Sequence, residues 1–292
     1  MHQSFESLID LLDLEQIDED IFRGRSRSAV IPRVFGGQVA AQALVAAGRT
    51  VPGDRAAHSL HAYFLRMGDP GAPIVYTVDR IRDGRSFTTR RVVAVQHGQP
   101  IFHLSASFQT YEEGLEHQAP MPQAPDPETL PTAEELLPRY SDVLDPDVLR
   151  RLLDAAQAVD LRYVDAPPYA SVGQPREPRS QVWFRTNGKL HGAIDQPLLH
   201  VCLATYVSDM TLLDSVLLAH GRGGWAVGDV VGASLDHAMW FHRPFRADEW
   251  LLYDQESPSA SAGRGLGQAR IYTRDGQLAV TVIQEGVVRI PR

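Results

Sequence analysis

The chain has 292 residues, of which 43% are hydrophobic, enough to bury one large core or two of ordinary domain size. Its formal net charge of -8 argues against a nucleic-acid-binding surface, because neutralising phosphates requires clustered Lys and Arg. The single cysteine, Cys202, excludes an intrachain disulfide and fits a reducing compartment.

The N-terminal segment predicts an amphipathic helix within residues 4–16, because its apolar residues follow helical spacing behind Ser4, a candidate N-cap. The segment is acidic, unlike a secretory signal or a transit peptide. No uninterrupted apolar run in the chain approaches the ~20 residues that span a bilayer. We therefore expect a cytoplasmic protein that does not insert into membranes.

The rest of the first half predicts one long helix followed by antiparallel strands. The helix covers residues 37–49, where the sequence VFGGQVAAQALVAAG is opened by two glycines and closed by Gly48. From about residue 59, β-rich runs are separated by the turn signals GDPGAP, DG and HGQ. One long helix against a meander of strands indicates a hotdog domain.

The middle of the chain is rich in proline. Residues 118–178 hold 11 of the 20 prolines, and proline interrupts strand ladders and stiffens extended chain. We expect a linker here, with a short helix at LRRLLDAAQAV. The linker divides the chain into an N-terminal domain over residues 1–117 and a C-terminal domain over residues 179–292.

The second half repeats the pattern of the first, with a strand at QVWFRTNG, a long helix over residues 197–219 and further strands to the C-terminus. Identical residues recur at a spacing of 176 to 178: His61 and His237, Phe64 and Phe241, Arg66 and Arg243, Tyr76 and Tyr253, Gly98-Gln99 and Gly276-Gln277. This repeat predicts two related domains. The alternative is chance identity between two β-rich halves.

Several stretches carry a resemblance to a known family: RVFGGQVAAQAL, HSLHAYFLRMGDP, GRSFTTRRVVAVQHGQPIFHLSASFQ, LDHAMWFHRPFRADEWLLY and QEGVVR. They resemble the acyl-CoA thioesterase II family, bacterial and peroxisomal enzymes with a double hotdog. The resemblance implies an α+β fold of two fused hotdog domains, hydrolysis of fatty acyl-CoA, and a homodimer or homotetramer. It also implies that Asp209, Ser234 and Gln284 form the active site, although some members have Thr in place of the serine.

The residues themselves single out two of these three side chains. Helical spacing aims the carboxylate of Asp209 along the apolar face of its helix, with a helix-capping or solvated aspartate as the alternative. Strand alternation places Gln284 on the face of Val280 and Val282, with a satisfied core amide as the alternative. Ser234 alone is unremarkable, since strand serines usually bond locally or to water.

Together, the three side chains could hold one water, with Asp209 as general base and Ser234 and Gln284 directing the water toward the thioester carbonyl. The chain has no G-x-S-x-G motif, which argues against a nucleophilic serine. A thiolate leaving group with a pKa of roughly 8.5 departs without a strong general acid.

Substrate contacts are expected at two kinds of residue. Gly36 and Gly37 allow the backbone to approach the oxyanion closely. Arginines suit the phosphates of CoA because they make bidentate contacts. The candidates flank matched turns: Arg85, Arg90, Arg91 and Arg264.

No metal or cofactor is expected, because CoA is part of the substrate. His237 and His242 lie five residues apart on a predicted strand and therefore on opposite faces, which makes a shared metal ion a poor interpretation. The sequence GRGLG at residues 263–267 lies between predicted strands and lacks the strand-to-helix context of a phosphate loop.

Two other functions remain open. A hotdog enoyl-CoA hydratase or dehydratase would need a paired Asp and His in a loop like G-D-x-N-P-x-H, and GDPGAP begins that way but lacks the His. A non-catalytic acyl-CoA-binding protein would have no reason to keep three polar residues at otherwise apolar positions.

Overall fold

The computed structural model describes residues 4–26 and 33–291. Its first half contains α1 (Phe5–Leu12), β1 (Glu15–Asp18), β2 (Ile21–Gly24), α2 (Gly36–Gly48), β3 (Arg55–Phe64), β4 (Ile74–Asp83), β5 (Phe87–Gln96) and β6 (Gln99–Thr110). A connecting region with α3 (Ala133–Leu136) and α4 (Pro146–Ala156) follows. The second half contains β7 (Val159–Tyr163), β8 (Arg179–Thr186), α5 (Pro197–Thr211), α6 (Asp214–Leu218), β9 (Val231–Ser234), β10 (Asp236–Phe241), β11 (Leu251–Ser261), β12 (Arg264–Thr273) and β13 (Leu278–Arg289).

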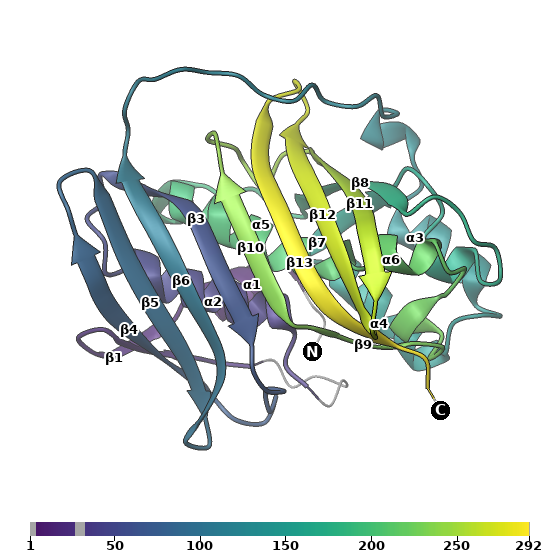
Figure 1. Ribbon diagram of the computed structural model, residues 1–292, viewed down its shortest axis with the longest axis horizontal. Helices are drawn as coiled ribbons and strands as arrows, with labels where there is room; N and C mark the ends of the chain where they lie inside the picture. The colour runs from purple at the N-terminus through teal and green to yellow at the C-terminus, as the bar shows by residue number, and fades with distance from the viewer. Residues whose placement is uncertain (1–3, 27–32, 292) are drawn as a thin grey trace.

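The strands of the described residues form one antiparallel sheet in the order β1-β2-β4-β5-β6-β3-β10-β13-β12-β11-β8-β7, with β9 paired to β13 (Figure 1). The two halves meet where β3 pairs with β10, from Tyr63 opposite Asp236 to Ser59 opposite Trp240. Outward from this seam, β6-β5-β4 on one side mirrors β13-β12-β11 on the other. The fold is the expected double hotdog.

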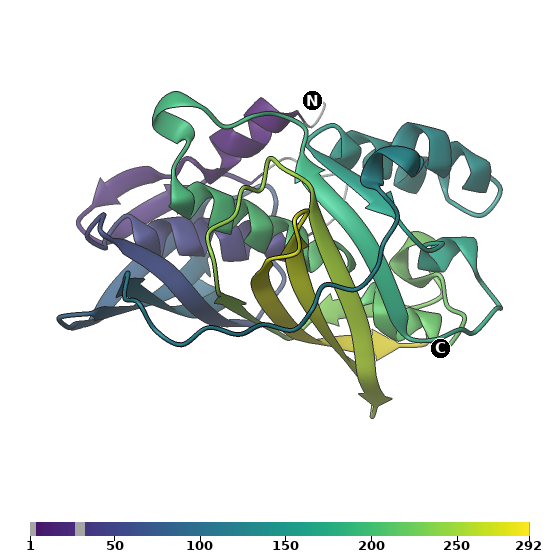
Figure 2. The ribbon, with the colours of Figure 1, turned by 90° about the horizontal axis from the view of Figure 1, so that it is seen from above.

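The long helices of the two halves pack against each other on one face of this sheet (Figure 2). They run antiparallel, since Gly37 of α2 meets the carbonyl of Tyr206 while Gly48 at the other end of α2 meets Leu198. A Cβ at Gly37 would lie 2.4 Å from the Tyr206 oxygen, so only glycine permits this approach. The start of α2 and the end of α5 thus lie together.

The predicted helix over residues 197–219 is broken in the structure. Helix α5 ends at Thr211 and α6 begins at Asp214. Three strand glycines make room for the break, because a Cβ at Gly265 would lie 2.4 Å from Val216, and Cβ atoms at Gly267 and Gly286 would meet Leu212 and Leu213. Gly265 and Gly267 of GRGLG therefore serve helix-to-sheet packing, whereas Gly263 has a positive φ in the turn between β11 and β12.

The predicted linker over residues 118–178 contains more structure than its proline content suggested. Besides α4, which lies where the sequence predicts a short helix, it includes α3, and β7 extends the sheet by pairing with β8. Its first part covers the sheet face away from the helices (Figure 2), where Met121, Ala124 and Leu130 pack on Trp183, Trp250 and neighbouring apolar residues. Two strands that the sequence did not predict, β1 and β2, extend the opposite edge beside β4.

In β3 and β10, the strands that join the two halves, equivalent residues lie 177 positions apart in the sequence. Phe64 and Phe241 end β3 and β10, and both His237 and its counterpart at this spacing, Leu60, are fully buried. His61 faces solvent and stacks on Trp240. The proposed equivalence of His61 and His237 is therefore wrong, because a shift of one residue turns a strand side chain to the other face.

One helical stretch among the described residues, Pro197–Leu218, has the length and hydropathy of a membrane span. It comprises α5, the break and α6, and 72% of its most apolar 18-residue window is buried inside the protein. Its apolar character is accounted for by its place between α2 and the sheet. The absence of membrane insertion stays a prediction.

Candidate active site

Asp209 lies in the last turn of α5, beside the first turn of α2. The Gly37 N–H donates a hydrogen bond to its carboxylate, and Phe35, the N-cap residue of α2, offers no side-chain cap. A carboxylate is favourable at this position because the N-terminus of a helix carries unpaired N–H groups and partial positive charge. A Cβ at Gly36 would lie 2.7 Å from Asp209 Oδ2, so the approach requires glycine there as well.

Ser234 and Gln284 both donate hydrogen bonds to the same oxygen of Asp209. The Ser234 Oγ lies 3.0 Å from Asp209 Oδ1, and the Gln284 Nε2 lies 2.5 Å from it. The three side chains come from the end of α5, the end of β9 and the middle of β13. The structure thus brings together the three residues that the resemblance implied.

The short segment between β9 and β10 holds Ser234 and Gln284 in register. The Leu235 N–H donates to the carbonyl of Glu285, and the Glu285 N–H donates to the carboxylate of Asp236 at 2.7 Å. These two bonds join the residues that come directly after Ser234 on one strand to the residue that comes directly after Gln284 on the other. The donors to Asp209 are therefore fixed to the sheet, and the acceptor is fixed to the helix.

Burial raises the pKa of Asp209 above the ordinary value of an aspartate. The hydrogen bonds from Gln284, Ser234 and the Gly37 N–H, together with the positive charge of Arg33, offset this effect in part. Its hydrogen-bond donors are neutral groups, and within residues 4–26 and 33–291 the carboxylate has no direct ion pair. Such a group keeps more affinity for a proton than a salt-bridged aspartate.

One atom of the Gln284 side-chain amide, Oε1, has no hydrogen-bond partner among the described residues. The side chain is fully buried, its Nε2 is used by Asp209, and no described residue donates to its Oε1. An ionised carboxylate only accepts hydrogen bonds, which fixes the amide with its NH₂ group toward Asp209 and its oxygen away. A buried acceptor without a partner marks a place where a donor from outside the chain would bind.

Arg33 is the functional candidate that the sequence did not single out. It lies just before α2, its Nη1 donates to the carbonyl of Gly232 at 3.1 Å, and its charge acts on Asp209. The signal that could have found it is its place at the head of the RVFGG segment, directly before the two glycines that meet α5.

The two predicted substrate-binding glycines permit close packing between α2 and α5, and their contact with substrate stays a prediction. Gly36 and Gly37 admit Asp209 and the Tyr206 carbonyl, and the Gly37 N–H is bonded to Asp209.

Two of the predicted arginines lie far from Asp209. Arg55, at the start of β3, donates to the Arg85 carbonyl, whereas Phe64 at the end of β3 lies beside Gly36. The nine residues between them span about 30 Å of strand. Arg90, bound to Thr50 and Asp83 at the same far end, is only 1% exposed. Arg85 and Arg90 therefore lie at the end of β3 remote from Asp209, and their contact with CoA stays a prediction.

The other two predicted arginines lie on the sheet face away from the helices. Arg91 is exposed and pairs with Asp79 at 2.6 Å. Arg264 pairs with Glu285 at 2.9 Å and alternates with the inward-facing Gly265. Neither side chain points toward Asp209.

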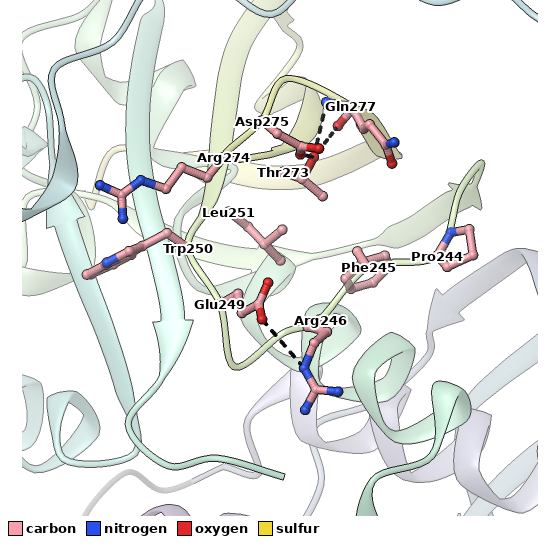
Figure 3. Close-up of a pocket in the computed structure, with 10 residues that line it drawn as sticks. All are labelled: Pro244, Phe245, Arg246, Glu249, Trp250, Leu251, Thr273, Arg274, Asp275 and Gln277. Atoms are coloured by element: carbon pink, nitrogen blue, oxygen red, sulfur yellow. Dashed lines mark hydrogen bonds and ion pairs between the residues drawn. The ribbon is translucent and has the colours of Figure 1, made fainter.

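A surface hollow of about 350 Å³ lies between Pro244–Leu251 and Thr273–Gln277 (Figure 3). It is lined by charged groups that already have partners, such as Arg246 with Glu249 and Arg274 with Glu128. Seven residues of chain separate Gln277 from Gln284, about 23 Å of strand. The hollow is therefore remote from Asp209. The described residues contain no group of three His, Cys, Asp or Glu side chains that could hold a metal ion.

Comparisons with known proteins place the chain in a family. Residues 154–287 match the family model described as acyl-CoA thioesterase, and residues 25–109 match the model described as acyl-CoA thioesterase N-terminal domain. The chain is 44% identical to human acyl-coenzyme A thioesterase 8, covering 96% of this chain and 88% of that protein. It is 42% identical to acyl-CoA thioesterase 2 of Haemophilus influenzae, covering 99% of both.

A solved structure gives the same result. The acyl-CoA thioesterase II of Mycobacterium marinum superposes with a TM-score of 0.79 at 44% identity, covering 97% of this chain and 98% of that one. Sequence, fold and the residues gathered around Asp209 agree, and the chain belongs to the acyl-CoA thioesterase family of thioester hydrolases.

Proposed function

We propose that this protein hydrolyses fatty acyl-CoA to a free fatty acid and CoA, with Asp209 as the general base that activates a water. The observation that carries the proposal is the convergence of Ser234 and Gln284 on one oxygen of a carboxylate that has no direct ion pair among the described residues. A base that is held in place, and whose pKa is raised by burial, suits proton abstraction from water near neutral pH.

The reaction proceeds in two steps. The water oxygen attacks the thioester carbonyl carbon as its proton passes to Asp209, and the spare Oε1 of Gln284 accepts the hydrogen bond of the other water proton. Collapse of the tetrahedral intermediate breaks the C–S bond. The electron pair leaves with the CoA thiolate, which takes up the proton from Asp209 or from solvent.

The oxyanion of this intermediate needs hydrogen-bond donors. We assign this role to the first turn of α2, where the N–H groups that precede that of Val39 have no acceptor within the helix. The positive end of the α2 dipole lies at the same place. Asp209 and the oxyanion donors would then lie on either side of the reacting carbonyl.

Release of thiol from palmitoyl-CoA, followed with a thiol reagent, tests this function. We expect one thiol and one palmitate per molecule of substrate. An enoyl-CoA hydratase would consume enoyl-CoA without releasing thiol, and an acyl-CoA-binding protein would bind palmitoyl-CoA without turnover. Either of these results would overturn the proposal.

We also propose a cytoplasmic homodimer or homotetramer that needs no cofactor and binds no nucleic acid. The resemblance supports oligomerisation, and so does the outer sheet face of the first half. This face is not covered by the linker and exposes aromatic residues such as Tyr63. Sedimentation equilibrium tests the assembly, and a mass near 32.3 kDa would contradict it.

A further inference from the structure

The last turn of α5 is tied to the sheet through its backbone. The final four carbonyls of a helix have no intrahelical donor, and in α5 these begin at Ser208. The Ser208 carbonyl accepts a hydrogen bond of 2.9 Å from the hydroxyl of Tyr253 on β11. The residue immediately before Asp209 is therefore held from one side of the sheet.

The side chain of Ser208 is held from a second strand. Its hydroxyl donates to the Thr205 carbonyl at 2.9 Å and lies 2.8 Å from Nε2 of His237 on β10. Because the hydroxyl proton is used toward Thr205, the imidazole must donate. Ser208 is fully buried and His237 is 1% exposed. Two strands thus fix Ser208 through its carbonyl and its hydroxyl.

The part of the first half that the structure describes has no such attachment at the two corresponding places. At the repeat spacing of 177, the counterpart of Tyr253 is Tyr76, whose hydroxyl donates to the side chain of Gln42 at 2.7 Å. The counterpart of His237 is Leu60. Both tyrosines are almost fully buried. The contacts of Tyr253 and His237 to Ser208 therefore have no counterpart at Tyr76 and Leu60 among the described residues, and the end of α2 is bonded instead by Arg90 of β5, which donates to the Thr50 carbonyl.

We propose that Tyr253, His237 and Ser208 are positioning residues for Asp209, which fix the end of α5 so that its carboxylate stays aligned with Ser234 and Gln284. The donors of Asp209 are attached to the sheet, whereas the carboxylate is attached to a helix that breaks a few residues later. A displacement near 1 Å at such a site can cost on the order of 10²-fold in rate. This inference rests on the proposed role of Asp209 as general base.

A pair of matched variants tests the role of Tyr253. Tyr253→Phe and Tyr76→Phe each remove one hydroxyl from a buried tyrosine that makes one hydrogen bond, so we expect similar losses of thermal stability. We expect kcat for palmitoyl-CoA to fall roughly 10-fold in Tyr253→Phe and to change less than about twofold in Tyr76→Phe, with KM little changed in both.

A second pair tests the imidazole and does not depend on how the tyrosine variants fold. His237→Leu introduces the residue that the first half has at this place, whereas His237→Gln keeps an N–H donor for Ser208. We expect kcat to fall in His237→Leu and to be at least partly restored in His237→Gln. Equal rates in these two variants, at equal thermal stability, would overturn the role of the imidazole.

The same measurements in an Asp209→Asn background separate this inference from the proposed function. If positioning acts through Asp209, Tyr253→Phe should cost nothing further once the base is lost. Asp209→Asn at the parent rate would overturn the proposed mechanism and this inference together. An impaired Asp209→Asn enzyme, with equal rates in Tyr253→Phe and Tyr76→Phe, would overturn the inference alone.

Discussion

The two ends of the α2–α5 helix pair occupy related places in the double hotdog, yet only one has the groups for hydrolysis. At one end, the start of α2 meets the end of α5, and neutral donors converge on Asp209. At the other end, Gly48 meets Leu198, and the nearby charges are neutralised in pairs. Arg49 bonds to Asp13, and Arg90 bonds to Asp83.

This comparison indicates what distinguishes a reactive carboxylate from a structural one. Asp83 is paired with a guanidinium, which lowers its pKa, whereas burial raises the pKa of Asp209 and its direct partners carry no charge. A carboxylate of low pKa is a poor proton acceptor. Both ends place a carboxylate near a helix terminus, and the partners decide what it can do.

The largest expected effect comes from removing the two carboxylates in turn. Asp209→Asn keeps the shape of the side chain and removes its basicity, so kcat for palmitoyl-CoA should fall by about 10²–10⁴-fold with KM little changed. The matched control is Asp83→Asn at the other end, which should leave kcat unchanged. Steady-state kinetics of both variants, with circular dichroism to verify folding, make the measurement.

Removing the donors should have an intermediate effect. Gln284→Ala loses a hydrogen bond to a charged group and the spare acceptor, so we expect kcat to fall roughly 10- to 100-fold. Ser234→Ala should cost about 5- to 10-fold. If both serve one water, the double variant will lose less than the product of the single losses, and a fully multiplicative loss would mean independent roles.

The pH dependence should differ from that of an ordinary aspartate. Asp209 must be ionised to act, so kcat/KM should fall as pH drops through its raised pKa, at a higher pH than for an unperturbed carboxylate. Arg33→Gln removes the charge that favours ionisation and should move this acid limb to higher pH, whereas Arg49→Gln should not. If the acid limb of the kcat/KM profile lies at the same pH in Arg33→Gln as in the parent, the charge of Arg33 does not favour ionisation of Asp209.

The smallest expected effect is on stability. A carboxyl group whose pKa is raised by folding binds more protons in the folded than in the unfolded chain. Its contribution to stability is therefore lost as pH rises between the two pKa values. Near neutral pH, the folded chain bears the free-energy cost of burying the ionised Asp209 carboxylate, and Asp209→Asn removes this cost. The variant should therefore have a higher melting temperature than the parent near neutral pH, with the difference shrinking toward acid pH. A lower melting temperature at neutral pH would contradict this prediction.

Part of the site was predictable from the regular spacing of apolar residues along the helix and the strand that carry it. Asp209 and Gln284 are polar residues at positions where the period requires apolar ones, and such conflicts often mark functional residues. Ser234 gave no such signal and came only from the resemblance. The break after Asp209 was not predicted, because it depends on Gly265, Gly267 and Gly286, which are distant in sequence.

The arginines could not be placed from sequence because charge alone does not specify a face or an end of a strand. Arg90 and Arg91 are neighbours, yet one is buried beside Asp83 and the other is exposed beside Asp79. The match of His61 to His237 failed for the same reason, since a spacing wrong by one residue reverses the face. In such strands, the face of the sheet toward which a side chain points matters as much as the residue type.

The most direct test of the central claim is a single turnover of palmitoyl-CoA by excess enzyme in water enriched in ¹⁸O. If Asp209 acts as a general base, water attacks the thioester itself. The first palmitate released will then carry one ¹⁸O from solvent, and the mass of the protein will not change. If Asp209 instead attacks the carbonyl, water opening the resulting anhydride at its aspartyl carbon would release unlabelled palmitate and leave ¹⁸O in the Asp209 carboxylate. Label found in the peptide that contains Asp209 after one turnover would contradict the account.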